Sequence, residues 1–189
     1  MDYRYQSSSI FPLLSLIRLL GNNVSVAEIG AGGGDSSFHA LQECPNISKY
    51  YAIEPYCEFV DTITYPQAGQ SQNIKYDLMH QDQQKMLFIH RQKFSSHKDK
   101  IKLIEKTSKN ALKDILDNSI DFIFHDAFPT YEDAIFDFTN WFPKLKKGGI
   151  YSGHDYNHPL VFKAVNEFVS SHNIKDKLLT VEFCWFLIK

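Results

Sequence analysis

The chain has 189 residues, of which 43% are hydrophobic and 22% charged, and its formal net charge is −2. This composition is ordinary for a globular domain and excludes an extended basic surface, so no nucleic-acid partner is expected. Three cysteines (Cys44, Cys57 and Cys184) stand far apart without a C-x-x-C pair, which favours free thiols and a reducing, cytoplasmic compartment.

The first apolar run, residues 10–20, predicts an amphipathic helix within an N-terminal segment 1–22. Pro12 is tolerated in the first turn of such a helix, and Arg18 interrupts the apolar run. The run lacks the basic flank and small-residue cleavage site of a secretory leader, and it is too short to span a bilayer. No membrane partner is therefore expected.

A glycine-rich turn follows the first predicted strand. Apolar residues alternate over residues 24–29, and four glycines come directly after them: Gly30, Gly32, Gly33 and Gly34. Asp35 and Ser36 then open a helical pattern that runs to about Cys44. The order of strand, tight turn and helix is typical of the first unit of a doubly wound sheet, with a nucleotide-like ligand on its turn.

The residues around this turn discriminate between two ligands. A G-x-G-x-x-G dinucleotide motif needs glycine where Asp35 stands, because the pyrophosphate sits on the helix N-terminus. A carboxylate there repels phosphate and suits a cation. S-adenosylmethionine (SAM) has no phosphate and carries a sulfonium and an ammonium group. The acid-x-Gly-x-Gly pattern from Glu28 to Gly32 therefore favours SAM, with an NAD-dependent oxidoreductase as an alternative.

The second strand, predicted over residues 49–55, ends in Glu54. This acid follows the glycine turn by about 20 residues, the spacing of the acid that binds ribose hydroxyls in Rossmann-like folds. Residues 56–100 are long for a crossover connection and carry a helical pattern over 77–94. We interpret 56–100 as a lid, an insertion or the surface of a homodimer, with an ordinary helix and surface loop as the simpler alternative.

Further along, strands and helices alternate. The patterns predict strands over 101–105, 120–126 and 149–155, and two final strands over 178–181 and 183–188. Ser108 is the predicted N-cap of one helix, and Thr130 with Asp133 forms a predicted capping box for the next. That next helix is expected to reach Leu145 and to end at the lysines and glycines that follow; a last helix begins near Pro159.

These elements predict a single α/β domain over residues 1–189. Its fold is a Rossmann-like, doubly wound, mostly parallel seven-stranded sheet with helices on both faces. Polar residues gather at the carboxyl ends of its parallel strands, the edge where such folds bind ligands: Glu28, Glu54, His125, Asp126, His154 and Asp155.

At the family level the chain resembles the class I SAM-dependent methyltransferases, and more narrowly the small O-methyltransferase-like group called methyltransferase domain type 24. The matching stretches, in order, lie at residues 28–36, 53–55, 107–108, 121–126 with 131–132, 145–156 and 161–168.

The resemblance implies roles for individual residues. Glu28 with the backbone of Gly30, Ala31 and Gly32 would hold the methionine end of SAM, and Asp35 and Ser36 would lie beside its amino-acid group. Glu54 would take the ribose hydroxyls, Thr107 and Ser108 would sit at the adenine edge, and Tyr131, at a helix start, would cover the adenosine. The residues that would face the sulfonium and the substrate are Asp126, His125, His154 and Asp155.

The expected reaction is methylation of a hydroxyl group on a small molecule or sugar. His154 or His125 would act as general base, or Asp126 and Asp155 would hold Mg²⁺ or a similar hard cation. The family usually carries an Asp-Gly-x-His-x-Tyr run after the fourth strand, and here Pro129 replaces the histidine. That departure motivates an alternative, a SAM-binding sensor or inactive homologue without transferase activity.

Overall fold

The computed structural model describes residues 7–56, 66–67, 70–71, 85, 87–127, 130–174 and 177–189. In chain order the larger elements are α1 (Ser7–Leu19), β1 (Val24–Ile29), α2 (Asp35–Glu43), β2 (Ile47–Ile53), β5 (Ile101–Ile104), α4 (Ser108–Ala111), β6 (Ile120–His125), α5 (Tyr131–Trp141), β7 (Leu145–Gly153), α6 (Pro159–Ser171), β8 (Leu179–Val181) and β9 (Cys184–Ile188). Two-residue strands β3 (Pro66–Gln67) and β4 (Gln70–Ser71) pair with each other, and residues 87–93 are helical and lead into the 3₁₀ turn η2 (Phe94–Ser96).

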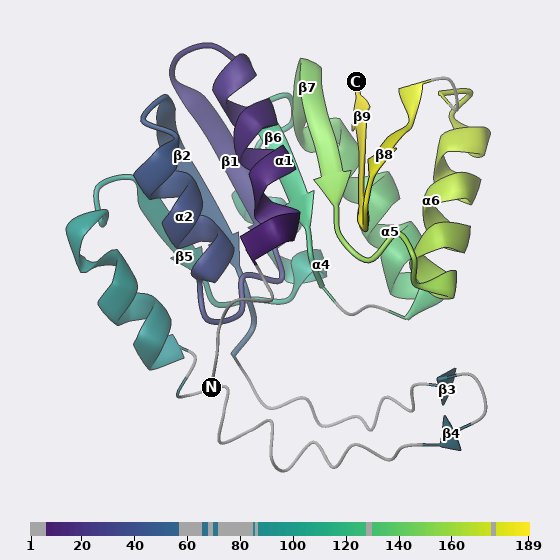
Figure 1. Cartoon of the computed structure of the whole chain (residues 1–189), viewed down its shortest axis with the longest axis horizontal. Coiled ribbons are helices and arrows are strands. Elements are labelled where there is room, and N and C mark those ends of the chain that lie inside the picture. The colour runs from purple at the N-terminus through teal and green to yellow at the C-terminus, as the bar shows by residue number, and fades with distance from the viewer. Residues whose placement is uncertain are drawn as a thin grey trace.

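One sheet organises the fold (Figure 1). Its strand order is β5-β2-β1-β6-β7-β9-β8. The pairs from β5 to β7 are parallel, and β9 runs antiparallel to both β7 and β8. This confirms the predicted seven-stranded, mostly parallel sheet. The chain turns back between β1 and β6, so a crevice is expected outside the carboxyl ends of these two strands.

Helices cover both faces of the sheet, each over its own apolar layer. Leucines and alanines of α1 and α2 pack with Phe94 on one face. Apolar residues of α4, α5 and α6, with Trp141 and Phe138 at the centre, fill the other. Figure 1 shows α1 and α2 in front of the sheet and α4 and α5 behind it. Within the described residues, no helix is both long enough and apolar enough to cross a bilayer.

The predicted end of the fifth helix is wrong. The helix α5 stops at Trp141, one 3₁₀ turn follows, and Leu145 already belongs to β7. The lysines and glycines expected to stop the helix are extended backbone: Lys146 Nζ bonds Asp121 Oδ2 on β6 at 2.8 Å, and Gly148 N–H donates to Lys189 O at 3.0 Å. Lysine is a good helix former in isolation, but here pairing with the chain end overrides that preference.

The predicted cap of α4 is displaced by one residue. Thr107, not Ser108, is the N-cap, and its hydroxyl accepts from Asn110 N–H at 3.3 Å. The capping box of α5 is confirmed: Thr130 Oγ1 accepts from Asp133 N–H, and the Asp133 carboxylate accepts from Thr130 N–H. Both caps start helices just beyond strand ends, so they fix how the loops at the carboxyl edge leave the sheet.

Candidate active site

The glycine-rich loop after β1 lies against two neighbouring strands. Gly30 and Ala31 donate N–H bonds to Ile53 O at the end of β2, at 2.9 and 3.2 Å. Gly30 has φ +90°, and a Cβ there would lie 2.3 Å from the carbonyl oxygen of Asp126. Only glycine permits this approach. The loop after β1 is thereby packed directly against Asp126, the residue that follows β6.

Gly32 stands at the open side of the same loop. It has φ +47°, and a Cβ added there would meet no atom within 4 Å. Its N–H donates to Glu54 Oε2 at 3.1 Å. Burial raises the pKa of Glu54, and the backbone N–H groups of Gly32 and Tyr56 partly offset this. The structure thus brings the predicted ribose acid to the predicted loop, beside open space.

Glu28 lies beneath the start of α2 and is 1% exposed. The Tyr50 hydroxyl donates to Glu28 Oε2 at 3.0 Å. Burial raises the pKa of Glu28 to about 8; the Tyr50 hydroxyl lowers it, and the charge of Asp126 raises it further. Glu28 is therefore a mostly neutral carboxyl near pH 7, poised to ionise when a cation approaches.

Asp35 and Ser36 form the first turn of α2, directly after Gly34. Lys93, from the helical residues 87–93, pairs with Asp35 and also donates to Gly33 O at 3.1 Å. Ser36 is half-buried. The predicted carboxylate is thus present at this helix start, where Lys93 pairs with it and partly offsets its charge.

Three ionisable side chains meet at the ends of β6 and β7. His154 Nδ1 lies 2.9 Å from Asp155 Oδ1 and 3.7 Å from Asp126 Oδ1. One ligand atom from each of the three residues lies within 4.8 Å of the others. The hydrogen bond with Asp155 raises the pKa of His154, while burial raises the pKa of Asp126. We call these three residues the acid–histidine cluster.

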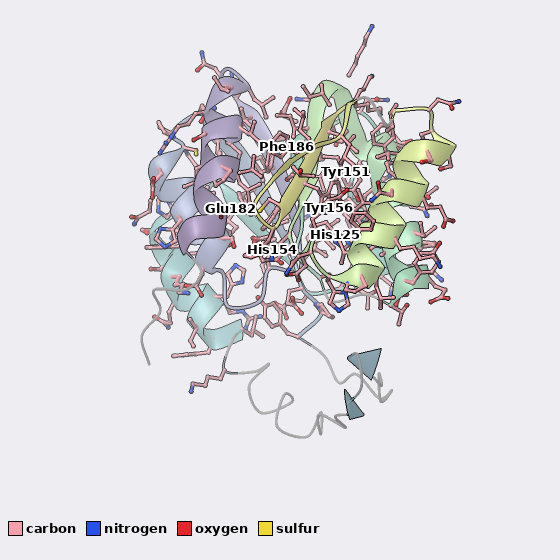
Figure 2. All side chains as sticks on the ribbon, turned by 45° about the vertical axis from the view of Figure 1, so that its right-hand side comes forward. His125, Tyr151, His154, Tyr156, Glu182 and Phe186 are labelled. Atoms are coloured by element: carbon pink, nitrogen blue, oxygen red, sulfur yellow. The ribbon has the colours of Figure 1, made fainter. Side chains whose placement is uncertain are left out.

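Figure 2 shows His154, Tyr156 and Glu182 at the end of the sheet where β7 stops, with Tyr151 and Phe186 further along the strands. Asp155 holds a left-handed backbone with φ +57°, which is uncommon for a residue other than glycine. The turn brings the side chains of His154 and Asp155 together beside the end of β6, a juxtaposition typical of functional sites.

His125 is not part of this cluster. Its Nε2 lies 3.1 Å from Asp137 Oδ2 on α5, and its ring packs edge-on against Phe138 at 5.1 Å. Both partners are buried in the layer between the sheet and α5. The structure therefore contradicts the sequence prediction that His125 faces the substrate, because the side chain points into the core rather than out of the strand end.

Three predicted cofactor contacts lie at the rims of the same edge. Thr107 and Ser108, both half-buried, start α4 beyond β5. Tyr131 starts α5, and its contacts are with α6: its hydroxyl donates to Glu167, and Lys163 Nζ lies 4.1 Å from its ring centroid. Those contacts orient Tyr131 toward α6. Residues 128–129, which include the substituted proline, lie outside the described residues.

The turn between β8 and β9 contributes a site residue that the sequence patterns missed. Val181 pairs with Cys184, which leaves Glu182 and Phe183 at the tip. Tyr156 N–H donates to Phe183 O at 2.8 Å, and the Phe183 ring lies 6.4 Å from that of His154. Phe183 is 49% exposed. The sequence around an exposed phenylalanine at a strand start does not indicate a functional role. Phe183 lies beside His154 only because β9 runs antiparallel along β7.

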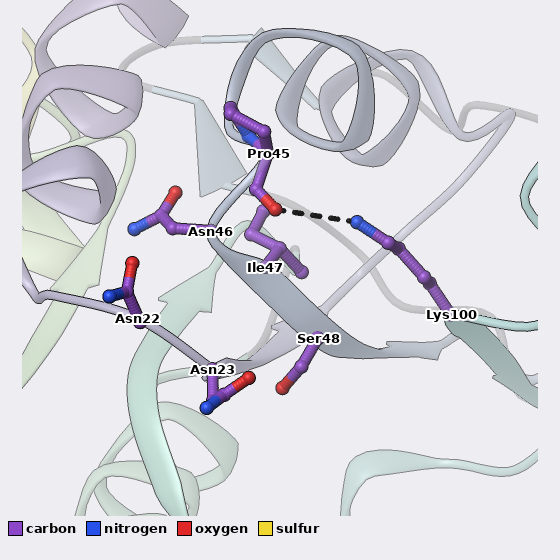
Figure 3. A pocket seen from close by; sticks show the side chains of 7 residues that line it. All are labelled: Asn22, Asn23, Pro45, Asn46, Ile47, Ser48 and Lys100. Carbon is purple, nitrogen blue, oxygen red and sulfur yellow. Dashed lines mark hydrogen bonds between the residues drawn. The ribbon is translucent and has the colours of Figure 1, made fainter.

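A polar hollow lies at the opposite, amino edge of the sheet (Figure 3). It is lined by Asn22, Asn23, Pro45, Asn46, Ile47, Ser48 and Lys100. Asn46 Nδ2 donates to Ile17 O and Gly21 O, so it ties α1 to the start of β2. These contacts are structural, and no residue of the acid–histidine cluster reaches this edge.

The sheet order, the glycine loop, the acid after β2 and the acid–histidine cluster together define a class I SAM-dependent methyltransferase fold. A family model described as a methyltransferase domain matches residues 27–156. The chain belongs to this methyltransferase family, and the resemblance seen in the sequence is confirmed.

The chain is also similar in sequence to a viral protein. "Uncharacterized protein R132" of Acanthamoeba polyphaga mimivirus is 26% identical over 157 residues, covering 79% of this chain and 61% of that protein. The chain thus spans less than two thirds of that relative.

Two solved structures share the fold at low sequence identity. The O-methyltransferase NovP has a TM-score of 0.68 at 18% identity, covering 94% of this chain and 79% of that one. An O-methyltransferase from Bacillus cereus in complex with SAH has a TM-score of 0.66 at 13% identity, covering 100% and 84%. At these identities the likeness establishes a common fold, not a common acceptor.

Proposed function

We propose that the protein transfers the methyl group of SAM to a hydroxyl group of a small molecule, and that the acceptor hydroxyl binds at the acid–histidine cluster. The observation that carries this is the meeting of Asp126, His154 and Asp155 beside the glycine loop, at the switch point of the sheet. Positioning of the reacting groups supplies much of the rate in a direct methyl transfer, and this edge can position both.

The cofactor side fits SAM. Gly32 leaves open space, Glu54 offers carboxylate oxygens for ribose hydroxyls, and the buried carboxyl of Glu28 offers a counter-charge for the ammonium group. Asp35 stands where a dinucleotide motif has glycine, which favours SAM over a pyrophosphate ligand. SAM supplies an electrophilic methyl group on a sulfonium, and the protein has to hold it in line with the acceptor oxygen.

On the acceptor side, His154 is the base that the geometry favours. Its imidazole is held by Asp155 and lies close to Asp126, so a proton taken from the acceptor hydroxyl would be stabilised by two carboxylates. The acceptor oxygen forms its bond to the methyl carbon as the carbon–sulfur bond breaks. The products are a methyl ether, S-adenosylhomocysteine (SAH) and a proton.

The same three side chains could instead hold a divalent cation. Two carboxylates and one imidazole nitrogen are suitable donors for Mg²⁺ or Mn²⁺, and Nδ1 of His154 lies beside a carboxylate oxygen of both Asp126 and Asp155. A cation there would favour the ionised acceptor hydroxyl. We therefore include Asp126, His154 and Asp155 as its ligands in the proposal.

Incubation with labelled SAM and a panel of phenols and sugars, with Mg²⁺, with Mn²⁺ and with a chelator, tests the proposal. We expect transfer to a hydroxyl, and loss of transfer with retained SAH binding in H154Q and D155N. D117N is the control, because Asp117 pairs with Lys144 at the far edge. Loss of activity in chelator supports the cation, and full activity in chelator leaves His154 as the base without it.

A SAM-binding protein without transferase activity is the second candidate, favoured by Pro129 in place of the family histidine. SAH binding without transfer to any acceptor in the panel would support it against the first. Cys44 is a buried free thiol, which supports the cytoplasmic location predicted from the cysteine spacing.

A further inference from the structure

The helical residues 87–93 and the following turn η2 pack against the glycine-rich loop after β1. Their side chains contact three consecutive glycines, Gly32, Gly33 and Gly34. This segment lies within residues 56–100, which are predicted from the sequence to form a lid, an insertion or a dimer surface. Its described residues pack against the glycine-rich loop.

The first contact is a hydrogen-bonded chain that ends on Gly32. The Tyr56 hydroxyl donates to Gly32 O and lies 2.5 Å from His90 Nδ1, and His90 Nδ1 itself lies 3.4 Å from Gly32 O. Tyr56 and His90 are 3% and 1% exposed. A carbonyl that accepts from a buried hydroxyl, itself held by His90, is kept in one orientation, and the N–H of the same residue faces Glu54.

The other two contacts come from the next turn of the segment. Lys93 Nζ donates to Gly33 O at 3.1 Å and pairs with Asp35. A Cβ on Gly34 would lie 2.7 Å from the Phe94 ring and 3.0 Å from the His90 ring, so both rings pack directly on the loop backbone. The loop is therefore held by hydrogen bonds at Gly32 and Gly33 and by packing of aromatic rings at Gly34.

The protonation state of His90 follows from its surroundings. The Tyr56 hydroxyl has one proton, which it gives to Gly32 O, so Nδ1 of His90 must be the donor to the tyrosine oxygen. Burial lowers the pKa of His90 to about 4, so the ring is neutral near pH 7 with its proton on Nδ1. In this tautomer Nε2 is an acceptor, and it has no hydrogen-bond partner among the described residues.

We propose that Tyr56 and His90 are positioning residues for the cofactor: they hold Gly32 in the conformation that presents its open side and Glu54 to SAM. The inference rests on the proposed function, because it takes this loop as the SAM site. Neither side chain needs to touch SAM. Their effect is to fix the loop before binding, so their loss weakens affinity for the cofactor and not for the acceptor.

Calorimetric titration with SAH tests the proposal without any acceptor. H90F keeps a ring against Gly34 and removes the donor, and Y56F removes the hydroxyl. We expect each variant to bind SAH about tenfold more weakly, the effect of losing one buried hydrogen bond. Because both belong to one chain of bonds, H90F/Y56F should lose much less than the product of the two single effects.

Two further variants separate positioning from folding. H90N places an amide N–H near the position of Nδ1 and should restore most of the affinity. Q92A, an exposed change in the same helical segment, should bind like the wild type. Thermal unfolding without ligand shows whether each variant folds, and if H90F does not, Y56F still decides the question.

Wild-type-like SAH binding by both folded H90F and Y56F, or a loss as large in Q92A as in either, overturns the inference while leaving the proposed function intact. Failure of the wild type itself to bind SAH overturns the cofactor site and the inference with it. Weaker binding in H90F and Y56F with recovery in H90N supports the positioning role.

Discussion

The ionisation of Glu28 affects the stability of the fold. Its pKa is raised from 4.5 to about 8, chiefly by burial, so the folded state binds its proton more tightly than the unfolded state. The stabilising contribution is full below pH 4.5 and is lost as the pH rises through about 8. E28Q keeps a neutral group of the same shape that still accepts from the Tyr50 hydroxyl.

We therefore measure the melting temperatures of E28Q and the wild type without ligand. The value for E28Q minus the value for the wild type should increase as the pH is raised from 5 to 9. Comparing the two proteins at each pH cancels the titration of the other groups. A melting-temperature difference that stays constant over this range would show that Glu28 is ionised in the folded protein throughout, contrary to the raised pKa.

Gly32 offers a second test at the residue scale. Gly21 and Gly32 both have positive φ, +80° and +47°, and a Cβ on either would meet no atom within 4 Å. G21A and G32A should therefore each destabilise the ligand-free protein by about 1 kcal/mol, the cost of a left-handed alanine.

Only G32A should affect the cofactor. Its methyl group would occupy the space proposed for SAM, and we expect SAH binding to weaken by about 10- to 100-fold, equivalent to 1–3 kcal/mol of overpacking. G21A, at the amino edge beside Asn46, is the matched control. Equal SAH affinity in the two variants would place the cofactor elsewhere.

Among the elements, the first strand and the cap of α5 were predictable because their signals are local. The apolar alternation at β1 and the capping box at Thr130 belong to short stretches of sequence, and both are confirmed. The start of β7 was not predictable, because Leu145 and Lys146 become a strand only through pairing with β6 and the chain end. Elements that depend on distant partners are the ones that local patterns miss.

The residues of the candidate site also differ in whether local sequence patterns could predict them. Glu28, Glu54 and the loop glycines follow from motif spacing, and the structure places them together. His125 looked equivalent to His154 in the sequence because each precedes an aspartate at a strand end. Because successive side chains of a strand point to opposite faces of the sheet, the side chain of His125 points toward Asp137 instead. The support by His90 and the position of Phe183 both arise from packing between segments far apart in the chain.

The β8–β9 turn is the element we expect to contact the acceptor. Phe183 lies beside His154 and is half exposed, so it offers apolar surface next to the acid–histidine cluster. F183A should raise the KM for the acceptor about tenfold through lost apolar contact, with unchanged SAH affinity by calorimetry.

L116A is the control, because Leu116 is also exposed, at 78%, and precedes β6 at the opposite edge. An effect of F183A on SAH binding, or none on the acceptor KM, would place the acceptor away from this turn.

At the scale of the whole molecule, the proposed function divides the carboxyl edge into a cofactor half and an acceptor half. The first comprises β1, β2, the glycine loop and residues 87–96; the second comprises the ends of β6 and β7 with the β8–β9 turn. The halves join where Gly30 packs against the backbone of Asp126 and where Asp126 N–H donates to Ile29 O at 2.8 Å. These backbone contacts would set the distance between the proposed cofactor and the acceptor.

This division predicts how SAH should change the protein. At a hundredfold excess over its Kd, SAH should stabilise the fold by about 2.7 kcal/mol, seen as a higher melting temperature, whereas NAD should not. Hydrogen exchange should slow most in residues 28–36 and 87–96, because the contacts of His90 and Lys93 tie these segments together. Exchange in β8 and β9 should change little until an acceptor is added. Protection by SAH confined to the β8–β9 turn, or equal stabilisation by NAD, would contradict the assignment of the two halves, since each ligand should order only the segments that surround it.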